Sequence, residues 1–157
     1  MSDASSPLTE TLEEFAFLRQ LTQDFLDVCT RDVLNFSGAS GAGAVWKQFR
    51  HLGRVQENYL DALESGVMAF ACDTGTYRGG ISRLDLSEYL ARIDARMREL
   101  FAAPLPHSRI AWPNAGCSVH VHLLRLSTHE SLHHGQMILC AREAGVSMPK
   151  SWRAWGV

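Results

Sequence analysis

The sequence lacks the signals that mark several large classes of protein. No apolar run in its 157 residues approaches the ~20 residues that span a bilayer, and residues 1–7 lack the basic and apolar regions of a secretory signal peptide. The formal net charge of -2 supplies no long-range attraction to nucleic acid or to an anionic membrane. We therefore expect a cytoplasmic protein with no nucleic-acid and no membrane partner.

Cysteine is scarce and never paired in the sequence. The four cysteines, Cys29, Cys72, Cys117 and Cys140, form no CxxC motif of the kind that binds zinc or exchanges disulfides. Without an export signal we expect reduced thiols, most of them in the core. Hydrophobic residues make up 46% and charged residues 20%, as in ordinary single-domain proteins. A chain of this length can bury a core without disulfides.

Apolar residues recur at three- and four-residue spacing in four segments, and no strand pattern is present. The segments expected to be helical span residues 8–34, 45–64, 85–103 and 118–144. Gly66 and Gly145 follow two of them, where glycine commonly ends helices. Four amphipathic helices in one domain covering residues 1–157 predict an all-α four-helix bundle.

The connecting segments are rich in glycine, serine and proline. The loop at residues 72–80 contains three glycines but neither Walker nor GxGxxG spacing, so we expect a plain connection and not a phosphate site. The two middle connections are long enough for a crossover, which leaves the helix order open. Residues 1–7 are expected to be disordered. The tail at 146–157 carries two tryptophans and is expected to pack on the bundle.

The most informative motif lies in the last predicted helix, where His133 follows His129 by four residues. Side chains at this spacing share one helix face, and two neutral imidazoles can bind one divalent ion. At ~100° per residue both lie near the middle of an apolar arc. The edges of that arc are Val119, Leu126 and Met137 on one side and Val121, Leu132 and Leu139 on the other. Unpaired imidazoles in a core are costly, and a shared metal satisfies both. The alternative is a pair of structural, hydrogen-bonded histidines.

A third ligand must come from another segment. His122 shares the helix face but lies about 10 Å along the axis from His129. His51, on the flank of the second apolar stripe, is the best candidate, although it also fits an ordinary surface or hydrogen-bonded histidine. His107, in a proline-rich loop, ranks below it. Three imidazoles leave coordination positions open, as in catalytic sites, and suit Zn²⁺, Ni²⁺, Co²⁺ or Fe²⁺.

The other polar residues of this helix have less direct roles. His120 and His134 are expected to face solvent or to support the site, and Glu130, rotated ~100° from His129, to lie at the surface or to support a ligand. Gln136 is close enough to the metal face to orient a ligand or substrate. Residues 129–133 also fit the HExxH pattern of zinc peptidases, in which the glutamate is the general base. The lack of predicted strands and the leucine at position 139, where metzincins have a third histidine, argue against that function.

The segment from His129 to Gln136, with the apolar run 137–139 and Gly145 after it, resembles the last-helix signature of the DinB/YfiT-like family of damage-inducible metal-binding proteins. That signature pairs a histidine with a glutamate, places a second histidine four residues after the first, and continues with Gly-Gln and a leucine-rich run. This chain has His134 where the family often has arginine. Residues 49–52, Phe-Arg-His-Leu, resemble the place where the family supplies its first ligand.

The resemblance implies a four-helix bundle in up-down-down-up order, often a homodimer, with a divalent ion held by His51, His129 and His133. Family members of known chemistry are thiol-dependent transferases or isomerases that use bacillithiol, mycothiol or glutathione. The resemblance therefore implies metal-assisted transfer of a thiol to a small electrophile. Two alternatives stay open: a non-enzymatic metal-binding stress-response protein, and a HExxH-type metallohydrolase that uses a metal-bound water. No catalytic residue beyond the ligands is assigned.

Overall fold

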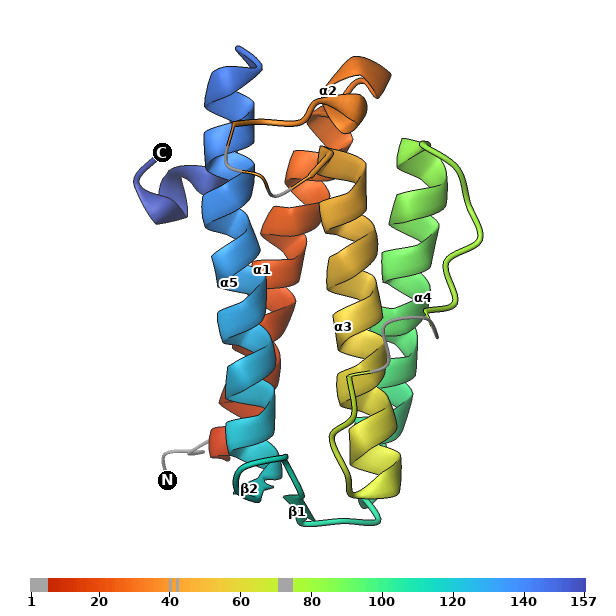
Figure 1. Cartoon of the computed structure of the whole chain (residues 1–157). Coiled ribbons are helices and arrows are strands. Elements are labelled where there is room, and N and C mark those ends of the chain that lie inside the picture. The colour runs from red at the N-terminus through yellow and green to blue at the C-terminus, as the bar shows by residue number, and fades with distance from the viewer. Residues whose placement is uncertain (1–5, 40, 42, 71–74) are drawn as a thin grey trace.

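Long helices run side by side in the computed structural model of the chain (Figure 1), which describes residues 6–39, 41, 43–70 and 75–157. The four longest in these residues are α1 (Pro7–Val28), α3 (Val45–Ser65), α4 (Arg83–Phe101) and α5 (Val119–Glu143). In Figure 1, α1 and α5 run upward while α3 and α4 run downward. The all-α bundle predicted from the apolar spacing is confirmed, and so is its up-down-down-up order.

The first predicted helix is two helices in the structure. α1 ends at Val28, and the short α2 (Arg31–Asn35) follows it. Cys29 is extended, with φ -72° and ψ 118°, and the Thr30 hydroxyl accepts a hydrogen bond from Val33 N. The prediction of one helix over 8–34 was wrong because apolar spacing continues across the break. Threonine at that point serves as an N-cap and does not continue the helix.

The start of α1 is set by two residues of the N-terminal segment. The Ser6 hydroxyl accepts a hydrogen bond from Thr9 N, and Pro7 occupies the first helical position. Proline suits that position because its missing N–H would have no helical partner there. The remainder of the segment expected to be disordered, residues 1–5, lies outside the described residues.

A long connection joins the end of α3 to the start of α4, and its length allows the crossover between these two helices. Gly66, with φ 79°, ends α3, and Ser82 caps the start of α4 by accepting from Asp85 N. Between them the chain returns along the bundle, so α3 and α4 run in the same direction (Figure 1). Residues 71–74 of the glycine-rich loop lie outside the described residues. In the described part, the backbone N–H of Thr76 donates to the Glu57 carboxylate.

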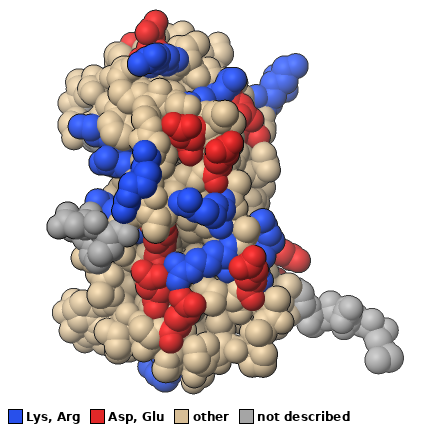
Figure 2. Space-filling view, turned by 90° about the vertical axis from the view of Figure 1, so that its right-hand side faces the viewer, with Lys and Arg blue, Asp and Glu red and all other residues tan. Residues whose placement is uncertain are grey.

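A small antiparallel ribbon precedes α5. β1 (Arg109–Ile110) pairs with β2 (Cys117–Ser118), and Ser118 then caps α5 by accepting from Val121 N. The expectation of no strands was wrong here because a two-residue strand gives no alternating pattern. On the side of the molecule seen in Figure 2, lysine and arginine are interspersed with acidic residues, and Arg96 forms ion pairs with Asp61 and Glu64.

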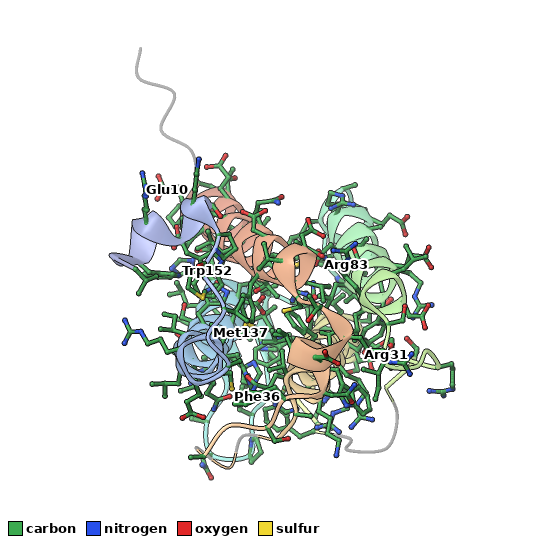
Figure 3. All side chains as sticks on the ribbon, turned by 90° about the horizontal axis from the view of Figure 1, so that it is seen from above. Glu10, Arg31, Phe36, Arg83, Met137 and Trp152 are labelled. Carbon is green, nitrogen blue, oxygen red and sulfur yellow. The ribbon has the colours of Figure 1, made fainter. Side chains whose placement is uncertain are left out.

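The tail packs on the bundle through one tryptophan. Trp152 lies in the 3₁₀ helix η1 (Lys150–Trp155), is fully buried, and donates from Nε1 to the Leu21 carbonyl at 2.8 Å. Its ring packs against Phe25, which packs against Phe49. Figure 3, a view along the bundle, shows Trp152 between the tail and the long helices and Met137 toward the centre.

The arrangement of the long helices creates two opposite faces. α5 packs against α1 and α3, and α3 packs against α4. Seen along the bundle in Figure 3, the α3–α5 side therefore lies opposite the α1–α4 side. Cys29, Cys117 and Cys140 are buried free thiols, whereas Cys72 lies outside the described residues. Within the described residues, no helix combines the length and the apolarity that crossing a membrane requires.

Candidate metal centre

His51 of α3 meets His129 and His133 of α5 where the two helices pack. The ring centroids lie 5.1 Å apart for His51 and His129, 5.0 Å for His51 and His133, and 4.7 Å for His129 and His133. One nitrogen from each ring lies within 4.8 Å of the other two. The two nearest, Nε2 of His51 and Nε2 of His129, are 3.2 Å apart. Two nitrogens bound to one tetrahedral zinc lie about 3.4 Å apart, so this pair already has ligand spacing.

Unsatisfied nitrogens distinguish this cluster from ordinary buried histidines. Among the described residues, Nδ1 of His129 and Nδ1 of His133 are buried without a hydrogen-bond partner. An unpaired buried polar atom costs about 1–3 kcal/mol, so a protein rarely keeps two of them side by side without a use. These orphaned atoms show that the rings are not held at Nδ1 by protein hydrogen bonds as ordinary core histidines are. The fit to a divalent cation comes from the nitrogens that face one another, one from each ring and all within 4.8 Å.

The protonation state of the cluster also suits a metal. Burial, together with the neighbouring histidines, lowers the pKa of His133 to about 3. Burial lowers the pKa of His129 to about 4, with smaller effects of His51 and Arg19. Burial and then the charges of Arg54 and Arg50 lower the pKa of His51. All three imidazoles are neutral at pH 7, which is the form that binds metals.

Arg54 is a residue of the candidate site that our sequence reasoning missed. Its Nη2 lies 2.9 Å from Nδ1 of His51, on the side of the ring away from His129. The available signal was spacing, because residues three apart on a helix are neighbours. The contact gives the site a cationic group that touches a candidate ligand directly.

Glu130 differs most from its expected position. It was expected at the surface or beside a ligand, yet it is only 1% exposed and faces α1. Its carboxylate accepts hydrogen bonds from Arg19 Nη2, at 3.2 Å, and from the Thr22 hydroxyl. Burial raises the pKa of Glu130, and Arg19 opposes that effect. Because Glu130 is bound on the α1 side, it is not placed to act as the general base of a HExxH site.

Three of the remaining histidines, His134, His122 and His120, lie within hydrogen-bond distance of protein groups. His134 is buried, not solvent-facing, and is hydrogen-bonded to the Thr22 hydroxyl at 2.8 Å and to Trp155 Nε1 at 3.2 Å. His122 is also buried, and its Nε2 lies 3.0 Å from the Tyr59 carbonyl. His120 contacts the Thr11 hydroxyl. His107, the lower-ranked third ligand, lies against Gly66 and does not belong to the cluster.

The apolar arc expected on α5 is rotated in the structure. Leu132 is 61% exposed and Leu139 47% exposed, so that edge of the predicted arc was wrong. Glu130 and His134 are buried instead. Arg19 of α1 pairs with the Glu130 carboxylate, and the Thr22 hydroxyl is hydrogen-bonded to both residues. Gln136 lies beside His133 and has a buried Oε1 without a partner among the described residues. Its role in orienting a ligand or substrate stays a prediction.

The fold and the cluster together define a helical-bundle protein with a candidate three-histidine metal centre. Residues 1–152 match the DinB family, and the chain belongs to that family. No protein of curated function matches the sequence.

Two solved structures share the fold. A DinB-like protein of Bacillus cereus ATCC 10987 is 20% identical, with a TM-score of 0.71, and the match covers 88% of this chain and 93% of that one. A DinB-like protein of Bacillus subtilis is 15% identical, with a TM-score of 0.72, and the match covers 90% and 97% of the two chains. At these identities the likeness concerns the fold alone.

Proposed function

We propose that this protein binds a divalent metal ion through His51, His129 and His133 and uses it to activate a low-molecular-weight thiol for transfer to a small electrophile. The observation that carries the proposal is the convergence of three neutral imidazoles from two helices. Zn²⁺, Ni²⁺, Co²⁺ and Fe²⁺ all suit such nitrogen ligands.

The number of ligands favours a reactive site over a structural one. The cluster in the described residues contributes three histidines, whereas structural zinc sites have four protein ligands. His133 is buried, but His51 and His129 are partly exposed, so a small molecule can approach from the α3–α5 side. These features support an ion with at least one position left for a substrate.

The charges around the cluster favour a thiolate. When bound, a divalent ion lowers the pKa of a coordinated thiol and holds it as the nucleophilic thiolate. The neutral histidines leave the charge of the ion uncompensated, and Arg54 and Arg50 add positive charge beside His51. Glutathione, bacillithiol and mycothiol are the thiols that we propose, the first two of which carry carboxylates that such charges attract.

Two measurements test the proposal in sequence. Elemental analysis of untagged protein should find a divalent metal bound to the chain. The loaded protein should then accelerate the reaction of 1-chloro-2,4-dinitrobenzene with at least one of the three thiols, and His129→Ala should lose that acceleration while His107→Ala keeps it. A bound metal with no acceleration for any thiol would favour the non-enzymatic stress-response alternative.

The hydrolase alternative makes a different demand. A HExxH-type mechanism needs Glu130 at the metal-bound water, but this carboxylate is held by Arg19 and Thr22 on the α1 side. We therefore propose thiol chemistry over hydrolysis. Hydrolysis of a peptide or ester substrate that is lost in Glu130→Gln, with the fold retained, would reverse that choice.

A further inference from the structure

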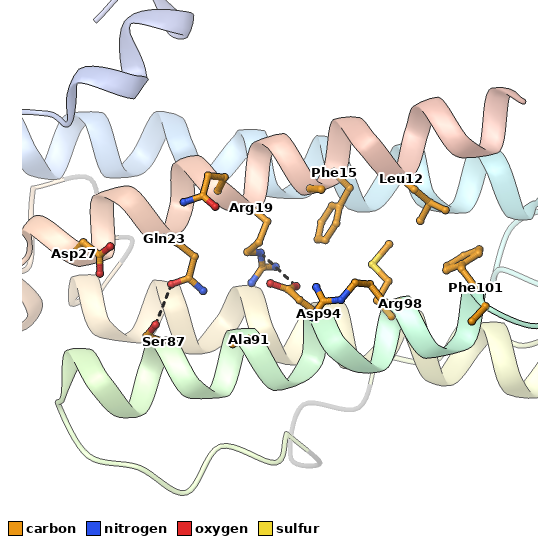
Figure 4. A pocket seen from close by; sticks show the side chains of 14 residues that line it. Leu12, Phe15, Arg19, Gln23, Asp27, Ser87, Ala91, Asp94, Arg98 and Phe101 are labelled. Carbon is orange, nitrogen blue, oxygen red and sulfur yellow. Dashed lines mark hydrogen bonds and ion pairs between the residues drawn. The ribbon is translucent and has the colours of Figure 1, made fainter. Parts of the chain in front are cut away.

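A long groove lies between α1 and α4 (Figure 4). The histidine cluster lies between α3 and α5, on the opposite side of the bundle (Figure 3). Its volume is about 690 Å³, within the range of ligand-binding pockets. Ala16 of α1 and Ala91 and Ser87 of α4 line it, and side chains this short do not fill the space between the helices. The fold therefore leaves a cavity that the proposed metal chemistry does not use.

One end of the groove is apolar. The lining there comes from the side chains Leu12, Phe15, Met97 and Phe101. Figure 4 shows Leu12 and Phe101 at this end, with Phe15 between them and the middle of the groove. A hydrocarbon portion of a ligand would be removed from water against these side chains, which favours binding.

The middle of the groove offers hydrogen-bond donors. Arg19 lines it, is only 4% exposed, and uses Nη2 for Gln56 and Glu130. Within the described residues, its Nε and Nη1 make no hydrogen bond. Asp94 Oδ1 is 3.9 Å from Nε, close enough for an ion pair but too far for a hydrogen bond. A buried guanidinium with two unpartnered nitrogens is an unusual feature that a ligand oxygen would satisfy.

The side chain of Arg98 provides a second positive charge in the middle of the groove. Figure 4 shows Arg98 in the groove close to Asp94, and its guanidinium has no hydrogen bond or ion pair to any described residue. The acids are less available to a ligand. Asp94 already accepts a hydrogen bond from Gln56 Nε2 at 2.9 Å, and Asp27 lies at the far end of the groove. The unpaired groups in the middle are thus donors with positive charge.

We propose that this groove is a second binding site, for an amphipathic carboxylate. The carboxylate lies at Arg98 and the unused N–H groups of Arg19, and the hydrocarbon chain extends toward Phe15 and Phe101. From Arg19 to Leu12 the groove runs about 10 Å along α1, a length that suits a medium-chain acid. The site is independent of the histidine cluster, so it does not rest on the proposed thiol chemistry.

Calorimetric titration with octanoate tests the proposal, with 1-octanol and octyltrimethylammonium as neutral and cationic probes of the same chain length. The expected result is saturable octanoate binding at least about tenfold tighter than that of either other probe. Equal affinities would overturn the carboxylate assignment, and no saturable octanoate binding would overturn the site.

Variants place the binding in the groove. Ala91→Trp fills the cavity and should abolish octanoate binding. Arg98→Glu should weaken octanoate binding about tenfold or more. Arg142→Glu is the control: Arg142 is also an exposed arginine in the last turn of its helix, but that helix is α5, so this change should leave binding unaltered. Unchanged binding in Ala91→Trp, or equal effects of the two charge reversals, would contradict the proposal. So would a wild-type homodimer that Ala91→Trp dissociates, since the groove would then be a subunit interface.

Discussion

Arg54 donates a hydrogen bond from Nη2 to Nδ1 of His51, across 2.9 Å. A guanidinium has no acceptor, so Nδ1 must be the acceptor and the neutral ring must carry its proton on Nε2. That proton points toward Nε2 of His129, 3.2 Å away. Neither nitrogen of His51 therefore has a lone pair free for a metal, because Nδ1 accepts the hydrogen bond from Arg54 and Nε2 carries the ring proton. A metal can bind His51 only after this arrangement is broken, so Arg54 opposes metal binding.

The first prediction concerns this opposition. Arg54→Met should raise the affinity for Zn²⁺ about tenfold, because a hydrogen bond to a charged group is worth about 1.5–3 kcal/mol and is no longer lost on binding. Competition with a chelating dye measures the change. Arg50→Met is the matched control, since Arg50 also adds positive charge near His51 but stacks on Trp46. Equal gains in both variants would show that charge alone matters, and weaker binding in Arg54→Met would refute the argument.

The second prediction concerns Glu130. Glu130→Gln should destabilise the protein by about 3 kcal/mol, because it leaves the buried Arg19 without its closest carboxylate. Urea unfolding measures the loss. The folded variant should still bind one metal ion per chain, since Glu130 faces α1 and not the histidines. Loss of metal from a folded Glu130→Gln protein would show that the carboxylate belongs to the metal centre.

The third prediction concerns acid. Burial lowers the pKa of His134 to about 4, and that of His129 also to about 4, below the unfolded value near 6.5. Between these values the unfolded chain binds more protons than the native one, so the free energy of unfolding rises with pH. The metal-free protein should therefore lose stability as the pH falls from about 6.5 toward 4. Urea unfolding across this range measures the slope. His134→Gln should flatten it and His107→Gln should not; a slope unchanged by His134→Gln would contradict the assignment.

The fourth prediction concerns the tail. Trp152→Ala should cost about 3–5 kcal/mol of stability, because the ring is fully buried against Phe25 and its N–H is satisfied by Leu21. Trp155→Ala, at a ring 42% exposed, should cost much less. Thermal unfolding of the two variants compares them directly. Similar losses would mean that the tail does not dock through Trp152 in solution.

The sequence predicted the helices better than it predicted the interior. Spacing placed α3 and α5 to within a residue or two, because Gly66 and Gly145 adopt the positive φ that ends a helix. It could not show the break at Cys29, since the apolar positions keep their spacing through it.

At the candidate site, too, local spacing was predictable and contacts between helices were not. The spacing of His129 and His133 is local and was visible, and His51 could be reached as the histidine on a neighbouring buried stripe. Glu130 and His134 were misplaced because the apolar arc was centred on His129 and His133, whereas in the structure Leu132 and Leu139 on one edge of that arc are exposed and the buried face includes Glu130 and His134. Their partner Thr22 is 108 residues away from Glu130 in the chain, a contact that only the fold creates. The groove was invisible for the same reason, as it depends on how α1 and α4 pack.

The central claim is that three imidazoles from α3 and α5 share one cation, and calorimetric titration of the metal-free protein with Zn²⁺ tests it most directly. Wild type and His107→Ala should each bind one ion per chain, His129→Ala and His133→Ala should show no stoichiometric binding, and His51→Ala should bind much more weakly. Wild-type affinity in His51→Ala, or its loss in His107→Ala instead, would contradict the account.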